Sequence, residues 1–169
     1  MLWFIPAASD NMIVLFRDFG LQGPYTGQMK AVLHQRAPGV PTIDLFADAP
    51  VGNPKASAYL LAAYAEWFVA ATIFLCVVDP GVGSARPAIV VEADGRWYVG
   101  PGNGLFELVE RRAASSRAWD IDWKPEVSRP AFTVAISSRR SQPCWRVAIR
   151  RPERCARMPH IVGQTGRTT

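Results

Sequence analysis

The sequence feature that most constrains the fold is an alternation of short apolar runs with segments of helical periodicity. Continuous apolar runs rich in β-branched residues predict strands that are buried on both faces, as in parallel sheets. Such strands are expected at 12–16 (MIVLF), 40–46 and 72–78 (TIFLCVV), with helices at 25–35, 55–67 and 105–112. This order predicts an α/β domain whose central sheet is mostly parallel and covered by helices on both faces.

A hairpin signal follows the third apolar run. Asp94-Gly95 separates two apolar segments, 88–92 and 96–99, and Asp-Gly is a preferred pair for a tight turn between antiparallel strands. Cys76 lies within an apolar run and is expected to be a buried thiol. The three cysteines have no metal-ligand spacing, so the sequence predicts neither a metal site nor a disulfide framework.

Charge divides the chain into unequal parts. Residues 128–169 hold nine Arg and one Glu, a charge of +8, whereas residues 1–127 hold ten Lys and Arg against thirteen Asp and Glu, a charge of −3. The net charge of +5 therefore belongs to the tail and gives no reason to expect that the folded part binds nucleic acid. We expect an N-terminal extension at 1–11, a domain at 12–127 and a disordered or poorly packed tail at 128–169.

Location and membrane contact follow from the same composition. No apolar run reaches the roughly 18–20 residues that span a bilayer, and the start MLWFIPAASDN has no basic segment typical of a signal peptide. The Arg-rich tail contains no aromatic pattern suited to base stacking, which disfavours a nucleic-acid partner. These observations predict a cytoplasmic protein without a membrane or nucleic-acid partner.

Three polar, glycine-containing loops follow predicted strands: 18–30 (DFGLQGPYTGQMK), 79–86 (DPGVGSAR) and 100–104 (GPGNG). Ligands of open α/β sheets bind at the carboxyl ends of the strands, and glycines let backbone N–H groups approach a ligand closely. Each loop alone is typical of an ordinary turn. Their recurrence at successive strand ends predicts one ligand site at this edge.

The same blocks, in order and spacing, resemble the SAM hydroxide adenosyltransferase family, the S-adenosylmethionine hydrolases related to the fluorinase and chlorinase. The resemblance runs over about 12–127 and is most specific at VVDPGVGSAR. It implies that family's Rossmann-like N-terminal domain and its reaction, in which water or hydroxide attacks the 5′ carbon of S-adenosyl-L-methionine to give adenosine and methionine. No cofactor is implied beyond this substrate.

The resemblance also implies site residues. Asp79 and Arg86 match the family's carboxylate and guanidinium, seven residues apart, which hold and activate the water. Asp18 matches the carboxylate that binds the ribose hydroxyls, and Asn103 falls in the loop that reads P-D-N-G in the family. The chain departs from the pattern at Arg17, Ala47 and Gly102, where the family commonly has Thr, His and Asp.

The family's third catalytic residue, a His in an FHGRD segment, has no counterpart here. Residues 132–136 read FTVAI, and His34 and His160 lie in other contexts. Codons for 132–146, when read in the frame that starts one base earlier, can encode FHGRDLFAPVAAMLA. We therefore hypothesise a frameshift near 128–132.

On this hypothesis the chain lacks the His, the helix that follows it and the family's C-terminal β domain. Intact family members place the substrate between subunits of a homotrimer, so the resemblance predicts little or no activity for this chain. The alternative interpretation is a non-catalytic nucleoside-binding fragment or the product of a pseudogene. A nicotinamide-binding domain is disfavoured, because no G-x-G-x-x-G follows the first strand.

Overall fold

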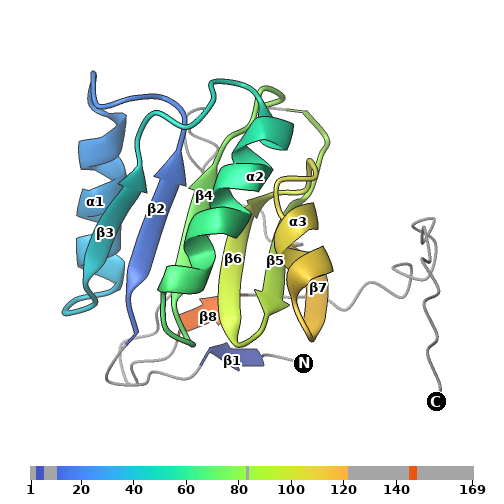
Figure 1. The fold of residues 1–169 in the computed structure, drawn as a ribbon. Coiled ribbons are helices and arrows are strands. Elements are labelled where there is room, and N and C mark those ends of the chain that lie inside the picture. The colour runs from blue at the N-terminus through green and yellow to red at the C-terminus, as the bar shows by residue number, and fades with distance from the viewer. Residues whose placement is uncertain (1–2, 6–10, 83, 122–144, 148–169) are drawn as a thin grey trace, which may run out of the picture.

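The computed structural model describes residues 3–5, 11–82, 84–121 and 145–147 (Figure 1). Its centre is a six-stranded sheet in the order β3-β2-β4-β6-β5-β7. The strands are β2 (Ile13–Arg17), β3 (Thr42–Phe46), β4 (Ile73–Val77), β5 (Ala88–Ala93), β6 (Arg96–Pro101) and β7 (Ser116–Ile121). The α/β fold class expected from the alternation of segments is therefore confirmed.

Four neighbouring strands, β3, β2, β4 and β6, run parallel to one another. Side chains of successive residues on β2 enter opposite hydrophobic clusters, with Ile13 and Leu15 in one and Val14 and Phe16 in the other. All four are buried, because layers cover both faces of the sheet. This is why the run carries no alternation of polar residues.

The sheet is mixed, so the expected mostly parallel order is found only in part. β5 pairs antiparallel with both β6 and β7, so two of the five pairings depart from the parallel pattern. The Asp94-Gly95 hairpin causes this reversal, with Ala93 paired to Arg96 and both turn residues at positive φ. The hairpin predicted from these two residues is confirmed.

The reversal of β5 matters for the loops. Ala88, the first residue of β5, lies opposite Pro101, the last residue of β6. Because β6 runs parallel to β4, the segment between β4 and β5 leaves and re-enters the sheet at one edge, the carboxyl edge of the parallel strands. The 100–104 loop lies at the same edge.

Helices cover both faces of the sheet (Figure 1). On one face lie α2 (Pro54–Tyr64), the short 3-10 helix η1 (Ala65–Trp67) and α3 (Glu107–Arg112), and on the other lies α1 (Tyr25–Arg36). α2 begins where the Asn53 side chain accepts the Ala56 N–H and Pro54 occupies the first turn. The predicted helix at 55–67 thus becomes an α-helix that ends in a 3-10 turn.

The third buried run behaves as its composition suggests. Cys76 on β4 is a free, buried thiol, and burial raises its pKa well above the ordinary value. A buried neutral thiol packs as a small apolar side chain, and the cluster around it includes Phe74 and Tyr98, whose rings stack at 4.9 Å between centroids. The expected buried thiol is confirmed.

Two three-residue strands form a separate antiparallel pair, β1 (Trp3–Ile5) and β8 (Trp145–Val147). The predicted N-terminal extension and basic tail otherwise lie outside the described residues. Within the part of the chain that the structure describes, no helix is long and apolar enough to cross a bilayer.

Candidate active site

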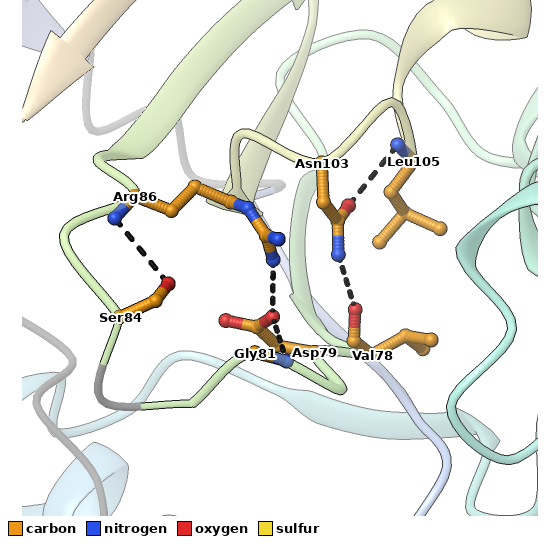
Figure 2. A network of polar contacts seen from close by, with 7 residues as sticks. All are labelled: Val78, Asp79, Gly81, Ser84, Arg86, Asn103 and Leu105. Carbon is orange, nitrogen blue, oxygen red and sulfur yellow. Dashed lines mark hydrogen bonds and ion pairs between the residues drawn. The ribbon is translucent and has the colours of Figure 1, made fainter.

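The candidate site lies where β4 ends and β5 begins. Val78 follows β4 and is fully buried, so the chain is anchored in the core immediately before Asp79 turns toward solvent. The loop then returns to the same edge at Pro87. A single short loop can therefore hold two interacting side chains, Asp79 at its start and Arg86 at its end (Figure 2).

Asp79 and Arg86 form an ion pair, with 2.6 Å between Nη1 of Arg86 and Oδ1 of Asp79. The same Oδ1 accepts the backbone N–H of Gly81 at 2.9 Å, which closes a turn on the aspartate side chain. The side chains are 19% exposed for Asp79 and 34% for Arg86, so water reaches both. The residues thus act together as a turn and as a charge pair, and no described residue hydrogen-bonds to Oδ2 of Asp79.

Gly81 gives the guanidinium its place. A Cβ added to Gly81 would lie 2.9 Å from Nη1 of Arg86 and 3.2 Å from Cζ, closer than side-chain contacts normally allow. The planar guanidinium therefore packs directly on the Gly81 backbone. Sequence reasoning treated this glycine as part of a turn and did not assign it to the ion pair.

The Gly81→Ala variant is expected to displace the Arg86 guanidinium while lowering the free energy of unfolding by less than about 1 kcal/mol. The end of a partly exposed, flexible side chain can move at low cost. Gly100→Ala is the contrasting variant, because its Cβ would lie 2.6 Å from the Cys76 carbonyl oxygen, and overpacking of this kind costs about 1–3 kcal/mol. Denaturant unfolding and crystal structures of both variants would check this; equal destabilisation would contradict it.

Asn103 joins the 100–104 loop to β4. Its side-chain amide donates to the Val78 carbonyl oxygen at 2.8 Å, and its Oδ1 accepts the Leu105 N–H at 3.3 Å (Figure 2). The Asn103 side chain is thus bonded to the residue that immediately precedes Asp79. Its predicted role in substrate binding is not tested by these contacts.

Asp18 lies at the end of β2, where its Oδ2 accepts the Gly52 N–H at 2.8 Å. A Cβ added to Gly52 would lie 3.7 Å from Cβ of Pro80, so the loop that contacts Asp18 also contacts the residue after Asp79. The 47–53 segment therefore joins the 18–30 and 79–86 loops. This segment was missed as a site element, since it contacts Asp18 through the backbone N–H of Gly52 and not through a side chain.

Arg17 is fully buried beneath the Asp18 loop, an unusual position for a guanidinium. It donates to Oδ1 of Asp44 at 2.7 Å and to Oγ1 of Thr26 at 3.2 Å, and it lies 5.6 Å from the centre of the Phe19 ring. Lys30 also donates to Asp44. Arg17, which stands where the family commonly has Thr, is thus paired with a counterion on β3, Asp44.

Asp44 is expected to give the fold an acid-sensitive contribution. Burial raises its pKa, but hydrogen bonds from Lys30 and Arg17 outweigh that effect, so the pKa of Asp44 is lowered. A lowered pKa in the folded state stabilises the fold above the ordinary Asp pKa of about 3.9, and the contribution is lost as pH falls below it. Urea unfolding at pH 7 and pH 3 should show a smaller pH-dependent loss for Asp44→Asn than for the parent chain; equal losses would contradict this.

The other residues considered from the sequence lie elsewhere or outside the description. His34 is on α1, and His160 is outside the described residues. Among the residues that the structure describes, no group of three or more His, Cys, Asp or Glu side chains could hold a metal ion.

Comparisons with known proteins identify the family. The family model for the SAM hydroxide adenosyltransferase N-terminal domain matches residues 13–138. The chain belongs to this family. The match extends past residue 127, where the sequence analysis placed the end of the domain.

Curated relatives carry the same family's activity in their names. The (R)-S-adenosyl-L-methionine hydrolase of Thermus thermophilus is 45% identical over 57% of this chain and 37% of the relative. That of Salinispora arenicola is 38% identical over 78% of this chain and 48% of the relative. The chain thus spans less than half the length of these family members.

A solved structure has the same fold. The crystal structure of an uncharacterized conserved protein from Thermotoga maritima superposes with a TM-score of 0.63 and 31% sequence identity, over 66% of this chain and 43% of that one. The similarity supports the α/β architecture on which the family's loops are placed.

Proposed function

We propose that this chain carries the water-activating part of an S-adenosyl-L-methionine hydrolase site. In the reaction, a water oxygen forms a bond to the 5′ carbon while the bond from that carbon to sulfur breaks. The electron pair of the broken bond stays on sulfur, which gives neutral methionine, and the water loses a proton as adenosine forms. The observation that carries the proposal is the Asp79–Arg86 pair at 2.6 Å within the loop of highest family resemblance.

The pair suits this chemistry because the two carboxylate oxygens of Asp79 differ in their hydrogen bonds. Oδ1 of Asp79 accepts from Arg86 and from the Gly81 backbone, whereas Oδ2 has no hydrogen-bond partner among the described residues. A water bound at Oδ2 would be oriented by a carboxylate whose charge Arg86 balances. The sulfonium is already a good leaving group, so orientation of water accounts for most of what the protein must supply.

Asp18 is proposed to bind the ribose. A carboxylate can accept hydrogen bonds from both hydroxyls of a cis-diol, and the Gly52 N–H already fixes one oxygen of Asp18. Asn103 is predicted as a second substrate contact. We further propose a cytoplasmic location. We also propose the homotrimer of intact family members, and size-exclusion chromatography with light scattering would test this oligomeric state.

The segment 128–169 is proposed to be the product of a shifted reading frame. It reads FTVAI at 132–136, and one alternative frame supplies the family's FHGRD. The proposed consequence is a low rate, because a missing water-activating group costs a factor on the order of 10²–10⁴.

Isotope labelling tests the proposed reaction. The chain is incubated with S-adenosyl-L-methionine in H₂¹⁸O, and the products are analysed by mass spectrometry. We expect one ¹⁸O in adenosine and none in methionine, at a rate well below that of the Thermus thermophilus hydrolase. Label in methionine, or binding of adenosine by calorimetry without any adenosine formation in the frame-corrected protein, would contradict the proposal.

A further inference from the structure

We infer that Asn103 is a positioning residue that fixes Asp79, and through Asp79 its ion pair with Arg86, by holding the Val78 peptide group, while the neighbouring Gly102 holds the backbone after Arg86. This role rests on the proposed function and differs from direct contact with the substrate. It follows from two contacts of the 100–104 loop with the residues that flank the 79–86 loop, Val78 and Pro87. Figure 2 shows the first of them, from Asn103 to Val78.

The first contact acts on Asp79. The Val78 carbonyl belongs to the peptide group that connects Val78 to Asp79, so its orientation sets the direction in which Asp79 leaves the strand. Asn103 donates to this carbonyl at 2.8 Å, beyond the last β4–β6 pair, Leu75 with Val99. The sheet itself therefore no longer holds the carbonyl, and the side-chain amide takes over.

The second contact acts on the other end of the loop. The Gly102 N–H donates to the Pro87 carbonyl oxygen at 3.0 Å, one residue after Arg86. A Cβ added to Gly102 would lie 3.1 Å from that same oxygen and 3.1 Å from the Ile89 side chain, so the approach is close. Asn103 and its neighbour thus bridge the residue before Asp79 and the residue after Arg86.

Asn103 is itself rigidly held, which a positioning residue requires. Its Oδ1 accepts the Leu105 N–H at 3.3 Å, and its backbone N–H donates to Pro101 at 2.9 Å. Leu105 is fully buried, so the loop is anchored in the core. Both ends of the side-chain amide are used within the protein, one on each of two loops.

The test is ¹⁵N NMR of the full chain, which follows the guanidinium N–H signals of Arg86, assigned by their loss in Arg86→Lys. We expect Asn103→Ala to keep a cooperative melting transition while exchange of these hydrogens with solvent speeds up about tenfold. The control is Asp94→Ala, which removes side-chain bonds to the Ala114 and Ser115 N–H groups at the opposite edge. It should lower stability but leave the Arg86 signals unchanged.

A conservative variant keeps the test decisive if Asn103→Ala does not fold. In Asn103→Asp, an ionised carboxylate would face the Val78 carbonyl oxygen and repel it, whereas the protonated acid can donate to it as the amide does. We expect slow Arg86 exchange in this variant at pH 3, below the ordinary Asp pKa of about 3.9, and fast exchange at pH 8, relative to the parent chain at the same pH. Parent-like exchange at both pH values, or equal acceleration by Asp94→Ala, would overturn the inference.

The readout is independent of turnover. If the frame-corrected chain releases no adenosine but Asn103→Ala still frees the Arg86 signals, the proposed function fails and the positioning role stands. If adenosine forms and the signals do not respond to Asn103, the positioning role fails alone.

Discussion

Correction of the reading frame by one base near the codons of residues 128–132 is expected to raise adenosine release from S-adenosyl-L-methionine by a factor on the order of 10²–10⁴. The corrected gene would encode FHGRD in place of FTVAI and so restore a side chain able to take part in proton transfer. The measurement compares initial rates of adenosine formation by the uncorrected and corrected chains at equal concentration. The gene sequence itself is the first check, since the hypothesis needs a one-base shift that yields FHGRD.

A matched control isolates the histidine. A second corrected gene carries alanine at the restored histidine codon and is otherwise identical. We expect the rate of adenosine formation by this protein to fall toward that of the uncorrected chain. If it retains the full rate of the corrected chain, the gain comes from the rest of the restored segment and not from the histidine.

Asp79→Asn in the corrected chain is expected to lower kcat by a factor on the order of 10²–10⁴ with a much smaller change in KM. The amide keeps the size of the side chain but removes the charge that pairs with Arg86 and is proposed to orient water. Because the loss falls on water activation, substrate binding through Asp18 should persist. Steady-state kinetics with adenosine detection would measure both constants.

Glu107→Gln is the matched acid-to-amide control. It removes an exposed helical ion pair with Arg111 on α3, and such pairs contribute about 0.3–0.5 kcal/mol. Its kinetic constants should equal those of the corrected parent. A kcat for Asp79→Asn within threefold of the parent would rule out the proposed role of this carboxylate.

Much of the fold could be predicted because local chemistry and burial agree. Apolar runs predicted β2 and β4, and Asp94-Gly95 predicted the hairpin of β5 and β6. The structure places strands in these segments. β7 was missed. Its sequence, SRAWDI, buries Trp119 alone, so it lacks the period that marks a strand and depends on pairing with β5.

The site was predictable in part. Asp79 and Arg86 are seven residues apart in sequence and meet at one loop, as the family resemblance implied. The roles of Gly81 and Gly52 were not predictable, because they depend on close approach of the backbone to side chains that are separated from it in sequence. The buried pairing of Arg17 with Asp44 likewise joins two strands and leaves no local signal.

The reversed strand β5 has a consequence for how this scaffold can change over evolutionary time. Since the eight residues from Asp79 to Arg86 leave and rejoin the sheet at one edge, both partners of the pair are inherited in a single stretch of gene. One recombination or insertion event in that stretch can exchange the whole pair while every strand keeps its neighbours. The arrangement makes the 79–86 loop a replaceable module on an otherwise unchanged sheet.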